Sequence, residues 1–351
     1  MKKYLFYTVS LGGGGAERVL TIIANKFSRE INVKVVIVSL LDVENEYSLS
    51  DSIKVIRMHG ENLNYISKIR LLRKILKSEK PDVLIAFMYF IAMQALLASM
   101  MLRIRVIVSE RNDPKQEIAG RPIVGFIRNF LYLFANRFVF QTYDALNYFP
   151  KYVRNKSVVI MNPIRENLPQ PYSGVRRNEI VNFCRLSPQK NLFLLIDAFC
   201  EVHKIHSQYI LSIFGNGELY SDLHLYIEKR GLSSCVFLNS SISDIHSRIR
   251  NSAMFVSSSN YEGISNSMIE AMALGLPTIC TDCPCGGAAM MIENGINGFL
   301  VPVGNRELLV NAMLKIIENP SLSKSLSIEA IKIRKRLSID VIINDWKKLG
   351  L

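Results

Sequence analysis

Two carboxylates separated by seven residues, Glu262 and Glu270, lie in the segment Tyr-Glu-Gly-Ile-Ser-Asn-Ser-Met-Ile-Glu. An apolar run at 253–256 precedes them and predicts a strand, and the residues after 266 predict a helix. Glu262 would then lie in the loop, and Glu270 in the first turns of the helix. Because the N-terminal amides of a helix attract anions, this arrangement predicts a site for a polar, phosphate-bearing ligand.

A purely structural interpretation also fits the same residues. Ser267-x-x-Glu270 matches a capping box, which stabilises the start of a helix without any binding role. Glu262 would then be an ordinary solvated loop residue. Short motifs of this kind arise often by chance, so other parts of the chain must decide between the two interpretations.

Two cations follow another predicted strand, at 180–184. They are Arg185 and Lys190, in the sequence Arg-Leu-Ser-Pro-Gln-Lys. A guanidinium can hold two phosphate oxygens at once, whereas an ammonium acts as a point charge, so together they could flank a diphosphate. The alternative is a pair of solvated loop cations, but the position directly after a strand favours a ligand site.

Glycine-rich loops follow two more predicted strands. Four glycines occupy 12–15, and Gly215-Asn-Gly217 follows the strand at 209–214. Glycines allow backbone amides to approach a phosphate closely. Neither loop has the Gly-x-Gly-x-x-Gly spacing of a dinucleotide site, and either could be a plain turn.

Strands and helices alternate along the chain in two blocks, which predicts an α/β protein with two Rossmann-like domains. The expected domains are 1–165 and 178–330, joined by a linker, with 331–351 forming a helix that returns to the first domain. Predicted strands span 4–9, 33–40, 53–58, 83–87, 105–108, 138–141, 157–161, 180–184, 209–214, 236–238, 253–256, 278–280 and 298–300. Ligands bind at the carboxyl ends of such strands, where each motif above lies.

The charge is concentrated in the first half. The 351 residues carry a net charge of +13, and residues 1–170 alone hold 25 Lys and Arg against 14 Asp and Glu. A basic half predicts an anionic partner, unless it is simply a solvated surface. No nucleic-acid signature is present, which leaves an anionic membrane surface or a phosphorylated substrate. The amphipathic stretches 63–80 and 123–135 are the candidates for contact with lipid.

Neither a membrane span nor a metal site is expected. The apolar run 84–102 is interpreted as a buried strand followed by a buried helix. Cys283-Pro-Cys285 has no second pair to complete a zinc site, and the chain contains no Asp-x-Asp. We therefore expect no cofactor and a cytoplasmic protein that can lie on the inner face of the cell membrane.

The ordered set Arg185-x4-Lys190, Gly215-x-Gly217 and Glu262-x7-Glu270 resembles the C-terminal half of the family-4 retaining glycosyltransferases. Their fold, called GT-B, has two Rossmann-like domains facing a central cleft. Gly-Gly-Ala-Glu-Arg-Val at 14–19 and Ser-Glu-Arg-Asn-Asp-Pro at 109–114 are similar to a bacterial branch that acts in surface-polysaccharide assembly.

The resemblance implies roles for matching positions. Arg185 and Lys190 would hold the diphosphate of a nucleotide sugar, Glu262 the transferred sugar, and Glu270 the ribose. Glu262, Arg185 and Lys190 would be the catalytic residues. The other implied donor contacts are Gly13, Gly14, Gly217, Gly263, Ile264, Ser265 and Asn266.

Two departures from the family pattern concern substrate contacts. Many relatives have a histidine where this chain has Ser109-Glu110-Arg111, so Glu110 and Arg111 become candidates on the acceptor side. Relatives also often have an Arg or Glu in the loop after Cys-Pro, where this chain has Ala288 and Ala289.

The expected activity is transfer of a hexose or N-acetylhexosamine from a nucleotide diphosphate sugar, with uridine as the expected nucleoside, to a saccharide acceptor carried on lipid. The product would enter O-antigen or capsule. Charge on the leaving diphosphate would be stabilised by Arg185, Lys190 and the helix N-terminus without a metal. The alternatives are a GT-B epimerase or hydrolase acting on the nucleotide sugar, or an inactive scaffold of a polysaccharide assembly.

Overall fold

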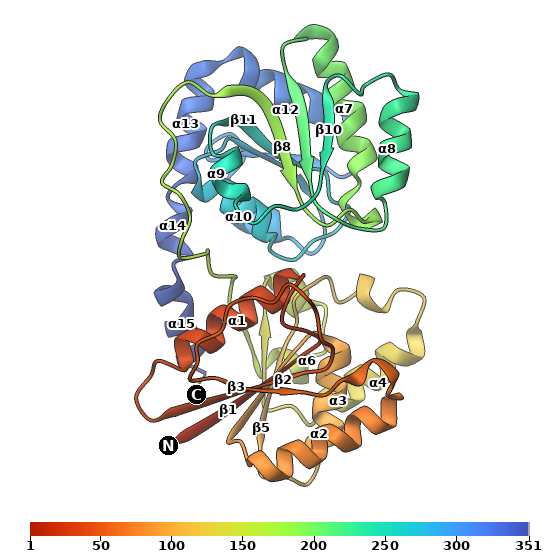
Figure 1. The fold of residues 1–351 in the computed structure, drawn as a ribbon, viewed down its shortest axis with the longest axis vertical. Coiled ribbons are helices and arrows are strands. Elements are labelled where there is room, and N and C mark those ends of the chain that lie inside the picture. Colours follow the sequence, from red (N-terminus) through yellow and green to blue (C-terminus); the bar gives the residue numbers. More distant parts are fainter. Residues whose placement is uncertain (350–351) are drawn as a thin grey trace. The chain divides into compact units, whose positions relative to one another are not determined.

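The computed structural model describes residues 1–349, which form two compact units (Figure 1). The first unit contains Met1–Pro163 together with the segment that begins at Ile339, and the second contains Ile164–Ser338. Residues 164–177, expected to be a linker, thus group with the second unit. Residues 331–338, expected to return with the C-terminal helix, also belong to the second unit, and only the part from Ile339 lies in the first.

A seven-stranded parallel sheet forms the centre of the first unit, with strand order β3-β2-β1-β4-β5-β6-β7. Its strands are rich in Val, Ile and Phe because both faces are covered by helices. The strands are β1 (Lys2–Thr8), β2 (Val33–Ser39), β3 (Lys54–Arg57), β4 (Val83–Phe87), β5 (Arg105–Ser109), β6 (Arg137–Phe140) and β7 (Ser157–Val159).

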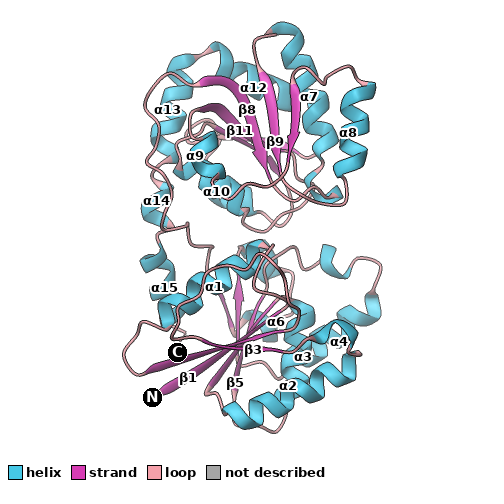
Figure 2. Cartoon of the chain, viewed as in Figure 1, coloured by secondary structure: helices cyan, strands magenta, loops and turns pink. Residues whose placement is uncertain are grey.

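Helices cover this sheet (Figure 2). The apolar run 84–102 forms a strand and then a buried helix, as expected, and no helix in residues 1–349 has the length and apolar character that a bilayer crossing requires. The helices of the first unit are α1 (Gly15–Phe27), α2 (Tyr65–Glu79), α3 (Tyr89–Ser99), α4 (Pro122–Tyr132), α5 (Tyr143–Asn147), α6 (Lys151–Arg154) and α15 (Ile339–Lys347), with 3-10 turns η1 (Gly60–Asn62) and η2 (Gln116–Ile118).

Helix α15 completes the first unit. The indole of Trp346 is buried and stacks on the ring of Phe87 at the end of β4, with 6.1 Å between centroids. Lys347 also forms an ion pair with Glu30, at 2.7 Å. Residues from the far end of the chain therefore fill part of the core built by residues 1–163.

The second unit repeats the architecture around a six-stranded parallel sheet, with strand order β10-β9-β8-β11-β12-β13. Its strands are β8 (Arg177–Phe183), β9 (Ile210–Phe214), β10 (Val236–Asn239), β11 (Ser252–Ser257), β12 (Thr278–Asp282) and β13 (Phe299–Pro302). Its helices are α7 (Leu192–Ile205), α8 (Tyr220–Lys229), α9 (Ile245–Ile249), α10 (Asn266–Ala273), α11 (Gly287–Met291), α12 (Arg306–Glu318), α13 (Pro320–Ala330) and α14 (Ile333–Arg336), with the 3-10 turn η3 (Pro188–Lys190).

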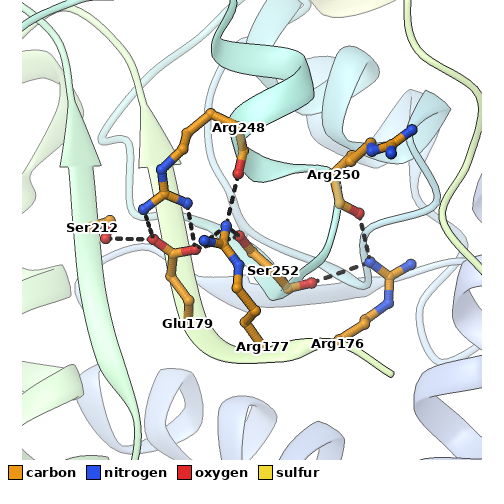
Figure 3. A network of polar contacts seen from close by, with 7 residues as sticks. All are labelled: Arg176, Arg177, Glu179, Ser212, Arg248, Arg250 and Ser252. Atoms are coloured by element: carbon orange, nitrogen blue, oxygen red, sulfur yellow. Dashed lines mark hydrogen bonds and ion pairs between the residues drawn. The ribbon is translucent and has the colours of Figure 1, made fainter. Parts of the chain in front are cut away.

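A buried carboxylate, Glu179, ties the amino ends of three strands together (Figure 3). It accepts hydrogen bonds from the hydroxyls of Ser212 on β9 (2.7 Å) and Ser252 on β11 (2.8 Å). Arg248 donates to both carboxylate oxygens, at 3.0 and 3.1 Å, and Arg177 lies 2.6 Å away. Burial alone would raise the pKa of Glu179, but these donors outweigh burial and lower it.

We expect Glu179→Gln to destabilise the second unit by about 2 kcal/mol. This is less than for a fully buried ion pair, because the Arg177 and Arg248 side chains are 40% exposed. Folding lowers the pKa of Glu179. The stabilisation that its charge gives the folded state is therefore present above the pKa of an unfolded glutamate, about 4.3, and disappears as the pH falls through the pKa of the folded state. Urea unfolding should show the gap between wild type and variant closing in acid. The matched control is Glu293→Gln at an exposed position, and a pH-independent gap would contradict the prediction.

Candidate nucleotide-sugar site

Loops at the carboxyl edge of the second sheet are joined by hydrogen bonds. The backbone N–H of Asn260, after β11, donates to the carbonyl of Gln189, after β8, at 2.8 Å. Cys285, after β12, donates to the carbonyl of Glu262 at 2.9 Å. The hydroxyl of Ser258 donates to the carbonyl of Lys190, also at 2.9 Å. The loops that follow β8, β11 and β12 therefore form one connected surface.

Lys190 and Glu262 meet directly on this surface. The ammonium of Lys190 donates to Glu262 Oε1 at 2.6 Å, and the amide of Gln189 donates to Oε2 at 2.7 Å. The two charged side chains are 15% and 16% exposed, so they are largely covered but still reach the surface. The structure thus brings together two of the three residues expected to be catalytic.

The electrostatic surroundings keep Lys190 charged. Burial disfavours the ammonium, but the Glu262 carboxylate outweighs burial and raises the pKa of Lys190. Nearby thiols are kept neutral, because burial and then Glu262 raise the pKa of Cys283 to about 12. Burial likewise raises the pKa of Cys184 to about 12. The neutral thiols therefore add no charge beside the Lys190–Glu262 pair.

Arg185 shares the loop after β8 with Lys190 and is exposed. The next residue, Leu186, is held by Asn216, whose carbonyl accepts from the Leu186 N–H at 2.9 Å. Gly217 lies so close to this strand end that an added Cβ would stand 2.3 Å from the Leu186 carbonyl oxygen. Glycine is therefore required at 217 for the packing of the loops, which is a structural reason that stands beside the expected donor contact.

Ser265, and not Ser267, caps helix α10. The Ser265 side chain accepts from the Met268 N–H at 3.4 Å, while the hydroxyl of Ser267 donates to the carbonyl of Phe183. The capping box expected from Ser267 and Glu270 is therefore wrong. Residues 263–266, expected to contact the donor, form the loop and first turn at this helix N-terminus, where the amides favour an anion.

The carboxylate of Glu270 lies behind this loop and is only 1% exposed. It receives a hydrogen bond at 2.9 Å from Nε2 of His246, a buried residue of α9 whose ring meets Phe183 edge to face. A ribose could reach Glu270 only if neighbouring residues moved.

His246 and Gln189 are the contacts that sequence reasoning missed. Gln189 could have been suspected from its place beside Lys190, whereas the sequence carried no signal for His246.

Gly13 and Gly14 belong to the first unit, in the loop between β1 and α1. Gly13 has φ +79° and open space around it, and Gly14 is the N-cap residue of α1. The hydroxyl of Tyr47 donates to the Gly14 carbonyl at 3.1 Å. An added Cβ at Gly14 would stand 1.9 Å from the carboxylate of Glu17, so the start of α1 already faces a negative group.

Glu110, an expected acceptor-side residue, is buried below the end of β5. Tyr132 donates its hydroxyl to Glu110, and the charge of Arg128 acts on it as well. Burial raises the pKa of Glu110, and burial followed by the Glu110 charge raises the pKa of Glu117 well above its usual value. The contacts that the structure shows for Glu110 are therefore made with the first unit's own core.

Arg111 is also buried. Its guanidinium lies over the rings of Phe87 and Trp346, 4.6 and 5.6 Å from their centroids, and donates to Asn162 Oδ1 at 3.1 Å. Burial lowers the pKa of Arg111 to about 9. The guanidinium therefore joins β5 to α15, and its contact with an acceptor stays a prediction.

Known families match both units. Residues 13–167 match the family model described as Glycosyltransferase Family 4, and residues 163–333 match the model described as Glycosyl transferases group 1. The chain is 26% identical over 346 residues to the amylovoran biosynthesis glycosyltransferase AmsD of Erwinia amylovora, covering 96% of this chain and 95% of the relative.

Two further proteins match along nearly the whole length. A Campylobacter jejuni α-1,4-N-acetyl-D-galactosaminyltransferase, whose name gives a PP-undecaprenol-linked saccharide as acceptor, is 24% identical over 99% of this chain and 98% of its own. The structure of Anabaena HepE in complex with UDP-glucose superposes with a TM-score of 0.84 at 20% identity, covering 99% of both chains. With two parallel-sheet Rossmann-like units of the GT-B fold and family matches spanning residues 13–333, the chain belongs to the family-4 glycosyltransferases.

Proposed function

We propose that this protein is a retaining glycosyltransferase that moves a hexose or N-acetylhexosamine from a UDP-sugar to a lipid-linked saccharide in surface-polysaccharide assembly. The observation that carries the proposal is the Lys190–Glu262 pair, at 2.6 Å, on the carboxyl edge of the second sheet. Ligands of open α/β sheets bind at this edge.

The pair suits a reaction in which a sugar–diphosphate bond breaks. Negative charge develops on the leaving diphosphate, and Lys190 carries a stable positive charge at this place. Arg185 is exposed on the same loop and adds a fork of donors for phosphate oxygens. We propose that these two cations stabilise the charge on the leaving diphosphate without a metal ion.

Glu262 and its neighbours would position the sugar. The carboxylate oxygens are held by Lys190 and Gln189, which fixes their direction, and each oxygen retains capacity to accept from a sugar hydroxyl. The N-terminus of α10 follows directly and favours phosphate. In this proposal Gln189 is a positioning residue, and Glu270, oriented by His246, reaches the ribose after a local shift.

Relatives support the choice of donor and acceptor class. Anabaena HepE has been solved with UDP, with UDP and glucose, and with UDP-glucose. The Campylobacter jejuni relative is named for transfer to a PP-undecaprenol-linked saccharide, and AmsD for amylovoran biosynthesis. A uridine donor and a lipid-linked acceptor are therefore the first to test.

Replacing Glu262 should abolish transfer without unfolding the protein. We expect Glu262→Ala to lower kcat by about 100-fold or more, since a preorganised polar contact in the reacting region is lost. UDP release in the presence of a lipid-linked saccharide extract would measure this. Glu293→Ala, at an exposed position of the same unit, is the control, and activity near wild type in Glu262→Ala would show that the assignment is wrong.

The donor can be identified by thermal stability. A ligand that binds only the folded state adds about 2.7 kcal/mol at a hundredfold excess over Kd, so UDP and UDP-sugars should raise Tm. Lys190→Ala should remove most of this rise, because its ammonium would contact the diphosphate. A larger rise with GDP- or ADP-sugars than with any UDP-sugar would contradict the uridine assignment.

A further inference from the structure

Helix α4 exposes most of its large apolar side chains and buries its charged one. Phe126 is 75% exposed, whereas the guanidinium-bearing side chain of Arg128, two residues later, is fully buried. A helix at the surface of a soluble protein has the opposite arrangement. The exposed apolar residues on the outward side of α4 and directly after it, called here the α4 apolar face, are Ile123, Phe126, Ile127, Phe130, Leu133 and Phe134.

The core beneath α4 fixes this orientation. Arg128 donates to the carbonyl of Pro114 at 3.0 Å, and its guanidinium lies 4.7 Å from the centroid of the Phe149 ring. Glu110 supplies the opposite charge and accepts from Tyr132, on the same face of the helix as Arg128. Turning α4 to hide its phenylalanines would expose these groups or leave them unpaired, which costs several kcal/mol. The outward apolar face is therefore held in place by the core.

Helix α2 provides a comparison within the same unit. Its apolar residues Leu72 and Leu76 are buried against the core, and Arg73 donates to the carbonyls of Ala98 and Met100 at the end of α3. The stretch 63–80, expected as a candidate for lipid contact, therefore uses its central apolar residues for packing. Helix α4 packs beside α3, buries Leu131 and Tyr132, and leaves the apolar residues of its outward face unused by the fold (Figure 1).

The charges around the α4 apolar face are positive. Arg121 at the N-cap of α4 and Arg137 at the start of β6 are both exposed. Lys156 donates to the carbonyls of Leu133 and Ala135 at the end of the helix, at 3.3 and 3.0 Å. No Asp or Glu occurs between Glu117 and Asp144 in the sequence, and the first half of the chain is strongly basic.

We propose that the α4 apolar face, bordered by Arg121 and Arg137, docks on an anionic lipid bilayer. Apolar side chains would lie at the boundary of headgroups and acyl chains, with α4 parallel to the surface and the arginines among the phosphates. A second protein copy would have to match three phenylalanines and also offset the surrounding positive charge, whereas anionic lipid supplies both partners. The docking does not depend on the donor or on the chemistry at Glu262.

Flotation of the full protein with vesicles tests the proposal. Wild type should float with equal parts of phosphatidylglycerol and phosphatidylcholine at low salt, and much less with phosphatidylcholine alone. The double variant Phe126→Ser, Phe130→Ser should bind the anionic vesicles about tenfold more weakly or worse, because two inserted rings are lost. The matched control is Ile66→Ser, an exposed apolar residue on α2, which should float like wild type.

Separate tests address the contribution of charge and the alternative that a second copy of the protein covers the α4 apolar face. Arg121→Glu, Arg137→Glu should weaken binding to anionic vesicles, and added salt should weaken the wild type. All these residues are exposed, so Tm should stay within about two degrees of wild type. Failure of the wild type to bind anionic vesicles, or a wild-type dimer that Phe126→Ser converts to monomer, would overturn the proposal. Glu262→Ala should still float, which separates docking from catalysis.

Discussion

Parallel pairing in the second sheet determines where its chemistry can occur. Because β8, β9, β11 and β12 all run in one direction, the loops that follow them emerge at one edge, although they are far apart in the sequence. Lys190 and Glu262 are 72 residues apart and meet there at 2.6 Å. If β8 or β11 ran in the opposite direction, the loop that follows it would emerge at the other edge of the sheet, and Lys190 and Glu262 would be separated.

The charged groups that hold the fold together differ in their surroundings from those of the candidate site. Glu179 and Arg128 are enclosed by donors or acceptors of the protein, and removing them from these partners would leave groups unpaired in the interior. Lys190 and Glu262 are each partly exposed, so a ligand at the carboxyl edge can reach both side chains. The ion pairs at the amino edge of the sheet thus tie strands together, whereas the pair at the carboxyl edge joins two loops beside the candidate site.

Much of the fold followed from periodicity, since runs such as 83–87 show the continuous apolar pattern of a strand covered on both faces. The proximity of Lys190 and Glu262 was also predictable, because each lies in a loop that follows a strand of the same parallel sheet. The true cap of α10 was not, since Ser265 and Ser267 are equally good capping residues two positions apart. Glu110, Arg111 and Arg128 lie inside and bind residues distant in the sequence, and the chemical type of a side chain does not reveal such partners.

The position of Trp346 has a consequence for biogenesis. The second unit is one continuous segment, Ile164–Ser338, and all of it has been synthesised before α15 leaves the ribosome. The first unit begins earlier but cannot cover Phe87 and Arg111 until residues 339–349 arrive. The second unit can therefore finish folding during translation, while the unit made first waits for its last helix.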